Sequence, residues 1–139
     1  MSLKEIEIEE IVDNFDLLED WEDKYIYLIE LGEKIEKFNP DEKKPEYLIE
    51  GCVSKVWITN TFDGDQLHFG AESESQIVKG LVALLLILFS GKNPKEILET
   101  DEKELFSELD LVSHLSGNRA NGLRAIVARM KKYAREISN

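Results

Sequence analysis

Apolar residues at the helical spacing of three and four positions mark the first part of the chain. Residues 3–15, LKEIEIEEIVDNF, carry three isoleucines, a valine and a phenylalanine among carboxylates in a mostly helical pattern. A second helix is predicted from Asp20, an N-cap residue with Asp23 three positions later. This helix ends either at Gly32 or, after a weaker stretch, at Phe38. The chain therefore begins with two amphipathic helices.

The middle of the chain changes to the pattern of a β-hairpin. The segment 39–46 contains two of the three prolines and predicts an exposed loop. Residues 55–62 are rich in β-branched and aromatic side chains, Asp63-Gly64 is a strong turn signal, and 66–70 predict the returning strand. The run 47–50 is a candidate for one more strand.

The second half of the chain is helical again, around one strongly apolar segment. A central helix is predicted to begin at Ser73, to form a capping box with Gln76 and to stop at Gly91. Its apolar residues lie nearly all round the helix, and we therefore expect it to be buried on most sides.

Three further helices are expected after this central one. Asn93 is an N-cap with Pro94 in the first turn, and Asp101 with Glu104 opens the next helix. The last helix begins near Asn118. Its apolar face consists of Leu123, Ile126, Val127, Met130, Tyr133 and Ile137. The pattern as a whole predicts a single α+β domain over residues 1–139, with a small antiparallel β-sheet packed by about six helices.

Composition and charge exclude several classes of protein. The net charge of −12 argues against a nucleic-acid partner, because phosphate binding depends on basic patches. The longest apolar run, at 81–89, has nine residues, whereas a membrane span needs about 20, so no membrane association is expected. The N-terminus lacks the pattern of a signal peptide. One cysteine and two histidines at wide spacing predict no disulfide, no metal site and a reducing, cytoplasmic location.

Charge is distributed unevenly along the chain. Residues 1–50 hold 17 acidic and 6 basic side chains, whereas 117–139 hold six basic ones, including all four arginines, against Glu136 alone. This asymmetry either steers a protein partner or only keeps the surface solvated.

The only cysteine, Cys52, lies between Gly51 and the predicted first strand of the hairpin. A lone cysteine is often a small buried hydrophobic residue without chemistry. Gly51 favours a sharp bend, however, and this places the thiol on a loop tip. A reactive cysteine needs access and a stabilised thiolate, for which the N–H groups of a turn and Lys55 are candidates. A strand lysine is more often simply solvated.

The two histidines are the candidate bases for a cysteine nucleophile. His68, on the returning strand, reaches Cys52 only if register and face agree, and is otherwise an ordinary strand-surface residue. His114 precedes the last helix, where helix-end or core hydrogen bonding is the ordinary role. The residues alone leave open a small cysteine-nucleophile enzyme using His68 or His114, and a non-catalytic adaptor in which Cys52 only packs.

The stretch GCVSKVWI at 51–58 resembles the signature around the sulfur-accepting cysteine of the SufE family. Four more blocks are similar to the family's blocks, in the same order and at similar spacing. They are WEDKYIYLIELG at 21–32, SESQIVKGLVALLLILFSG at 73–91, NPKEIL at 93–98 and HLSGNRANGL at 114–123. The five blocks cover most of residues 15–135. The family commonly has glutamine where this chain has Val53 and Lys55.

The resemblance implies a sulfur-transfer protein. SufE-like proteins accept sulfane sulfur as a persulfide from a pyridoxal-phosphate-dependent cysteine desulfurase (SufS-like). They stimulate this enzyme and pass the sulfur to an iron–sulfur scaffold complex (SufBCD-like). The family fold is α+β and similar to the IscU-type scaffold. A persulfide carrier of this kind has no independent turnover and no cofactor of its own, since pyridoxal phosphate belongs to the desulfurase; we expect a monomer in the free state.

By the same resemblance, Cys52 matches the sulfur acceptor and Gly51 the bend before it. Arg119 with Gly122-Leu123 matches the family's R-x-x-G-L block. Arg119 then either helps the donor complex to dock or anchors the last helix. We expect the Cys52 sulfur to be sheltered against apolar residues, with Val53, Val56 and Trp57 as candidates, and to move out when the desulfurase binds.

Overall fold

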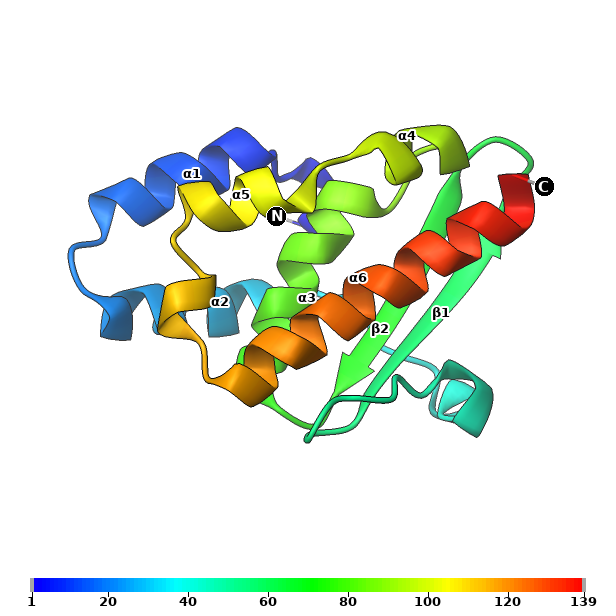
Figure 1. Ribbon diagram of the computed structural model, residues 1–139, viewed down its shortest axis with the longest axis horizontal. Helices are drawn as coiled ribbons and strands as arrows, with labels where there is room; N and C mark the ends of the chain where they lie inside the picture. Colours follow the sequence, from blue (N-terminus) through cyan, green and yellow to red (C-terminus); the bar gives the residue numbers. More distant parts are fainter. Residues whose placement is uncertain (1, 139) are drawn as a thin grey trace.

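Six α-helices and one two-stranded antiparallel sheet form residues 2–138, the part of the chain described by this computed structural model (Figure 1). The α+β prediction is confirmed. The elements are α1 (Ile8–Leu17), α2 (Trp21–Gly32), β1 (Val56–Phe62), β2 (Leu67–Ser73), α3 (Gln76–Phe89), α4 (Pro94–Glu99), α5 (Glu102–Glu108) and α6 (Gly117–Ser138). Short 3₁₀ turns lie at Leu3–Glu5, Pro40–Glu42, Pro45–Tyr47 and Val112–His114.

Strands β1 and β2 form the predicted hairpin. The ladder runs from Val56 opposite Ser73 to Phe62 opposite Leu67. Asp63 shapes the turn, because its side chain accepts hydrogen bonds from the backbone N–H groups two and three residues later, at 2.9 and 2.7 Å. This local turn chemistry explains why the hairpin is readable from the sequence.

The returning strand is longer than predicted, and the central helix starts later. Ser73 pairs with Val56 at the end of the ladder, so it is extended and caps no helix. The N-cap of α3 is Ser75, whose hydroxyl accepts a hydrogen bond from the N–H of Val78 at 3.3 Å. The predicted capping box between Ser73 and Gln76 was therefore wrong, because Ser73 pairs in the β-ladder and Ser75 is the residue that caps the helix.

Helix α3 is the centre of the core, as its apolar pattern predicts. Nine of its 14 residues are buried. It packs closely against α2 where two glycines, Gly32 and Gly80, face each other: a Cβ on Gly80 would lie 2.3 Å from the carbonyl oxygen of Leu28. The backbones of the two helices are thus in direct contact.

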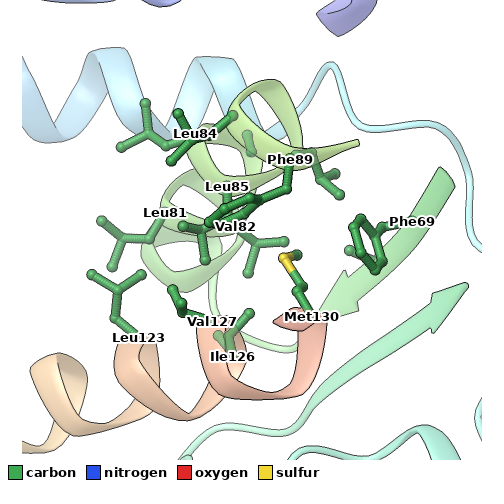
Figure 2. Close-up of a cluster of buried hydrophobic side chains, with 14 of the residues drawn as sticks. Phe69, Leu81, Val82, Leu84, Leu85, Phe89, Leu123, Ile126, Val127 and Met130 are labelled. Atoms are coloured by element: carbon green, nitrogen blue, oxygen red, sulfur yellow. The ribbon is translucent and has the colours of Figure 1, made fainter. Parts of the chain in front are cut away.

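Helix α6 packs on another side of α3 and runs beside the hairpin (Figure 1). Figure 2 shows the cluster of buried hydrophobic side chains around α3 and α6, and it labels Phe69, Leu81, Val82, Leu84, Leu85, Phe89, Leu123, Ile126, Val127 and Met130. Tyr133 donates a hydrogen bond to the carbonyl oxygen of Ile58 in β1 at 3.0 Å. Arg129 donates to the carbonyl oxygens of Glu46 and Leu48 at 3.1 and 3.2 Å. Helix α6 is therefore hydrogen-bonded both to β1 and to the segment that contains Glu46 and Leu48.

Three helix starts agree with the sequence. Asp20, Asn93 and Asp101 cap α2, α4 and α5, each accepting a hydrogen bond from a backbone N–H in the first turn. Helix α2 ends at Gly32, the earlier of its two candidate ends. Over residues 2–138, none of the helices combines the length and the apolar character needed to cross a membrane.

Two further stretches differ from the prediction. Helix α1 begins at Ile8, since residues 3–5 form a separate 3₁₀ turn. The run 47–50 forms no strand, and only Leu48 makes an isolated bridge with Trp57. The 3₁₀ turn that ends at Tyr47 and the bend that follows leave too little extended chain for a ladder.

Candidate functional site

Cys52 lies on a short loop, residues 50–55, whose base is closed by backbone hydrogen bonds. The N–H of Ile49 donates to the carbonyl oxygen of Val56 at 2.8 Å. Lys55 and Glu74 add two more bonds at the base, Lys55 N–H to Glu74 Oε1 at 3.2 Å and Glu74 N–H to the Lys55 carbonyl at 3.1 Å. At the tip, Gly51 has φ of +94°, a conformation that favours glycine. The loop is thus fixed at its base and sharply bent beside Cys52.

The Cys52 side chain is half-buried and lines a cavity of about 290 Å³ between this loop, α3 and the first turns of α6. Its Sγ lies 3.7 Å from the carbonyl oxygen of Gly122, to which the S–H group donates. The other residues that line the cavity are Val53, Ser54, Val78, Leu81, Ser116, Asn118, Arg119, Leu123 and Ile126. The lining is therefore mostly apolar, with polar contributions from Ser54, Ser116 and Asn118 and a single charged residue, Arg119.

Burial raises the pKa of the Cys52 thiol. Lys55 is exposed and does not line the cavity, so it is not the cation that the sequence offered for a thiolate. In this closed arrangement the thiol is protonated at neutral pH and is a poor nucleophile, because only the thiolate attacks.

The sulfur is sheltered, but by other residues than expected. Val53 lines the cavity, yet the residue is 81% exposed. Val56 and Trp57 are buried in β1 and do not line the cavity. The sulfur instead contacts Gly122 of α6, and Leu81 of α3 and Ile126 of α6 line the same cavity. The prediction failed here because it used only residues near Cys52 in the sequence.

Neither histidine lines the cavity. His68 pairs with Asp63, Nε2 to Oδ2 at 3.0 Å, near the hairpin turn. In the ladder it lies opposite Thr61, five residues along β1 from Val56, a separation of about 16 Å at 3.3 Å per residue. Register therefore keeps His68 away from the thiol.

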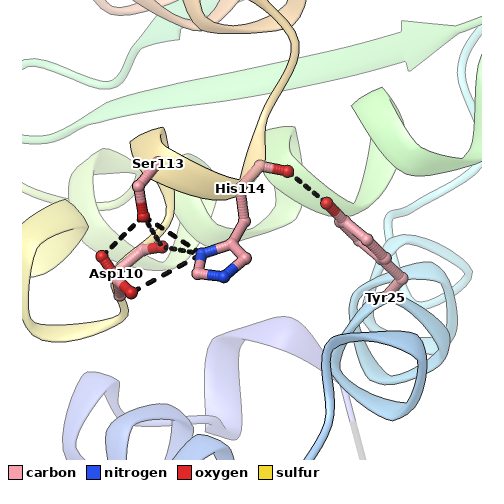
Figure 3. A network of polar contacts seen from close by, with 4 residues as sticks. All are labelled: Tyr25, Asp110, Ser113 and His114. Atoms are coloured by element: carbon pink, nitrogen blue, oxygen red, sulfur yellow. Dashed lines mark hydrogen bonds and ion pairs between the residues drawn. The ribbon is translucent and has the colours of Figure 1, made fainter.

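His114 has a structural environment of its own (Figure 3). Its ring stacks on Trp21 at a centroid distance of 4.0 Å, and its Nδ1 lies 3.0 Å from the carbonyl oxygen of Asp110. Its own carbonyl accepts a hydrogen bond from the Tyr25 hydroxyl. Among the described residues, those that line the cavity include no histidine and no carboxylate, so no side-chain base for an enzyme of the cysteine-nucleophile class lies beside Cys52.

Arg119 lies in the first turn of α6 and lines the cavity. Its N–H donates to the Ser116 hydroxyl at 3.2 Å, which caps the helix start. The guanidinium and the positive end of the helix dipole both favour an anion at this position. Arg119 therefore lies both at the cavity and at the start of α6. Its role in docking the donor complex or in anchoring the last helix stays a prediction.

Two more residues shape the site: Gly122, which belongs to the R-x-x-G-L block, and Arg129, which has no signal of its own in the sequence. Gly122 faces the thiol directly, and a Cβ at this position would lie 3.2 Å from Sγ. Arg129 fixes the chain before the loop through two backbone carbonyls. Arg119, Gly122 and Ile126 recur at helical spacing, so one face of α6 reaches the cavity. This periodicity and the R-x-x-G-L block both include Gly122, but neither predicts its contact with Cys52.

The fold and the sheltered thiol define a small α+β protein with one solvent-reachable cysteine. Residues 9–134 match the SufE family, described as an Fe-S metabolism associated domain. The chain belongs to the SufE family, as its five motif blocks predict.

Known relatives agree with this assignment. An uncharacterized SufE-like protein of Rhizobium meliloti (strain 1021) is 40% identical over 131 residues, covering 91% of this chain and 94% of that protein. A second, from Rhizobium etli, is 40% identical over 132 residues, covering 92% and 89%. The solution structure of a hypothetical protein from Thermus thermophilus has a TM-score of 0.74, 18% sequence identity and 93% coverage of both chains, which shows a shared fold.

Proposed function

We propose that this protein is a cytoplasmic sulfur carrier. It accepts sulfane sulfur on Cys52 from a pyridoxal-phosphate-dependent cysteine desulfurase, stimulates that enzyme, and passes the sulfur to an iron–sulfur assembly scaffold. Membership in a family associated with Fe–S metabolism supports sulfur transfer in general. The observation that carries the assignment to Cys52 is the position of the chain's only thiol, on a bent loop against a cavity with room for added sulfur.

The transfer step is an exchange at sulfur. The Cys52 thiol first loses its proton to solvent, and the thiolate attacks the outer sulfur of the persulfide on the desulfurase cysteine. A new S–S bond forms at Cys52 while the S–S bond of the donor breaks, and the donor cysteine leaves as a thiolate. The sulfane sulfur keeps its oxidation state, so the step needs no external oxidant or reductant.

The raised pKa of Cys52 makes the closed arrangement a resting state. Attack requires that the sulfur leave the cavity, because exposure to water restores an ordinary thiol pKa and opens a path to the donor. The loop suits such a movement, since its base is fixed by hydrogen bonds while its tip bends at Gly51. We expect docking of the desulfurase to release the thiol.

Labelled sulfur tests the proposed function. The protein is incubated with a cysteine desulfurase and isotopically labelled cysteine, and Cys52 is examined by mass spectrometry without reduction. We expect one labelled sulfur atom on Cys52, and none in the Cys52→Ser variant, which also loses the transfer of sulfur. An adaptor predicts that Cys52→Ser keeps full stimulation of the desulfurase. A cysteine-nucleophile enzyme predicts turnover of a small substrate without any partner.

Thiol reactivity tests the resting state separately. We expect iodoacetamide to alkylate Cys52 in the free protein more slowly than an unstructured peptide thiol at the same pH. Addition of a desulfurase whose own active-site cysteine is replaced by serine should then speed the alkylation, because docking alone exposes the loop. A free protein that reacts as fast as the peptide contradicts the shielding.

A further inference from the structure

We infer that Gly122 is the positioning residue that holds the carrier's thiol in its unreactive form, and this inference rests on the proposed function of Cys52. The residue acts in two ways. Its missing side chain leaves the space that the sulfur occupies, and its carbonyl oxygen accepts the hydrogen of the thiol. Gly122 thus touches no donor sulfur itself and works through Cys52.

The space argument is specific to the cysteine. A Cβ at position 122 would lie 3.2 Å from Cys52 Sγ and 3.9 Å from both Cα and Cβ of Cys52. These are its three nearest neighbours outside the local helix backbone, so a methyl group here meets the cysteine loop first. Sulfur and carbon in ordinary contact are farther apart than 3.2 Å. We expect the loop to move, because its backbone hydrogen bonds lie at its base, whereas the bond at its tip is the weak one from the Cys52 S–H to Gly122.

The carbonyl argument concerns protonation. A thiol has a hydrogen to donate to the Gly122 oxygen at 3.7 Å, whereas a thiolate has none and meets the negative end of the C=O dipole. This contact therefore favours the protonated form, in the same direction as burial. If the sulfur moves away from position 122, it loses this contact and part of its burial, and both losses lower the pKa of the thiol.

The test is the Gly122→Ala variant, with Gly117→Ala as a matched control. Gly117 also lies in the first turns of α6, but a Cβ there meets nothing within 4 Å. The rate of Cys52 alkylation by iodoacetamide is measured against pH for the two variants and the parent protein. We expect Gly122→Ala to move the midpoint of the profile to lower pH and to raise the rate near neutral pH, about tenfold for each unit that the thiol pKa falls. Gly117→Ala should match the parent profile.

An unchanged profile for Gly122→Ala, or a midpoint at higher pH, overturns the inference. A thermal unfolding curve accompanies each variant. Alanine is a better helix former than glycine, so a fold with the parent's unfolding midpoint is expected for Gly122→Ala. Gly122→Ser, which places the same Cβ against the sulfur, gives a second, independent measurement and should shift the profile in the same direction. No desulfurase takes part in these measurements. A negative result here therefore contradicts the role of Gly122 without contradicting the proposed function, and a negative labelled-sulfur test contradicts the proposed function without affecting these measurements.

Discussion

The close contact between α2 and α3 makes Gly80→Ala the sharpest prediction for the fold. Its Cβ would lie 2.3 Å from the carbonyl oxygen and 2.6 Å from the carbonyl carbon of Leu28, whereas real Cβ atoms essentially never come within 3.0 Å. The helices must then separate by at least about 0.7 Å along this contact. Both neighbours are backbone atoms, so no side-chain rotation relieves the overlap.

The magnitude follows from two opposing effects. Overpacking of a well-packed core costs about 1–3 kcal/mol, and the backbone contact places this site at the upper end. Replacing glycine with alanine inside a helix stabilises the helix by about 1 kcal/mol. We therefore expect Gly80→Ala to lower the free energy of unfolding by about 2 kcal/mol, or the Tm by about 8 °C for a protein of this size.

Urea denaturation followed by circular dichroism measures this loss. Gly117→Ala is the control, since a Cβ there lies in open space, and it should leave the midpoint unchanged or raise it slightly. Equal or greater stability of Gly80→Ala would refute the reasoning that α2 and α3 touch through their backbones. Helix α3 also lines the Cys52 cavity through Val78 and Leu81, so the same variant should alter the alkylation rate of the thiol.

Two further predictions concern Asp63 and Arg129. Hydrogen bonds from the Gln66 N–H, the His68 side chain and the Asp65 N–H lower the pKa of Asp63 to about 2. Since this pKa lies below the unfolded value of about 3.9, the carboxylate stabilises the fold fully above about pH 4, and the contribution is lost as pH falls through about 2. A carbon NMR titration should give a midpoint near 2, and a midpoint near 4 would show that the turn bonds do not persist in solution. Arg129→Lys removes the fork that holds the carbonyls of Glu46 and Leu48, and we expect a loss of about 1–2 kcal/mol in urea denaturation. The control is Arg124→Lys, because Arg124 bonds an exposed asparagine on its own helix. This variant should lower the free energy of unfolding only slightly. Equal losses in the two variants would contradict a stabilising role for the bonds of Arg129 to Glu46 and Leu48.

The features that the sequence predicts well are those that depend on residues close together in the chain. The hairpin turn at Asp63 and the caps Asp20, Asn93 and Asp101 each depend on a side chain and a backbone N–H two or three positions apart. The start of α3 failed for the opposite reason. Ser73 and Ser75 are equally good caps locally, and the choice is made by the pairing of Ser73 with Val56, 17 residues earlier.

The site divides in the same way. Cys52 and Gly51 are visible in the sequence as a thiol beside a bend, and Arg119 through the family's motif. Gly122 belongs to the same motif, but its contact with the thiol is not visible in the sequence, because it lies 70 residues from Cys52. Leu81, another residue that lines the cavity, lies on a third element. Only the packing of α3, α6 and the loop brings them together. A cavity of this kind is a property of tertiary structure. Periodicity predicts which face of a helix is buried, but not which element packs against that face.

The closed base of the Cys52 loop also limits how far the sulfur travels. Cys52 is three residues along the chain from Ile49, whose backbone is bonded to Val56. A fully extended chain spans at most about 3.6 Å per residue, so the Cα of Cys52 stays within about 11 Å of that anchor. The loop is therefore a short tether and not a long swinging arm. In the proposed function, a donor or recipient would therefore have to bring its own reactive centre to the surface beside α6, and the fit between the two protein surfaces would decide where the sulfur goes.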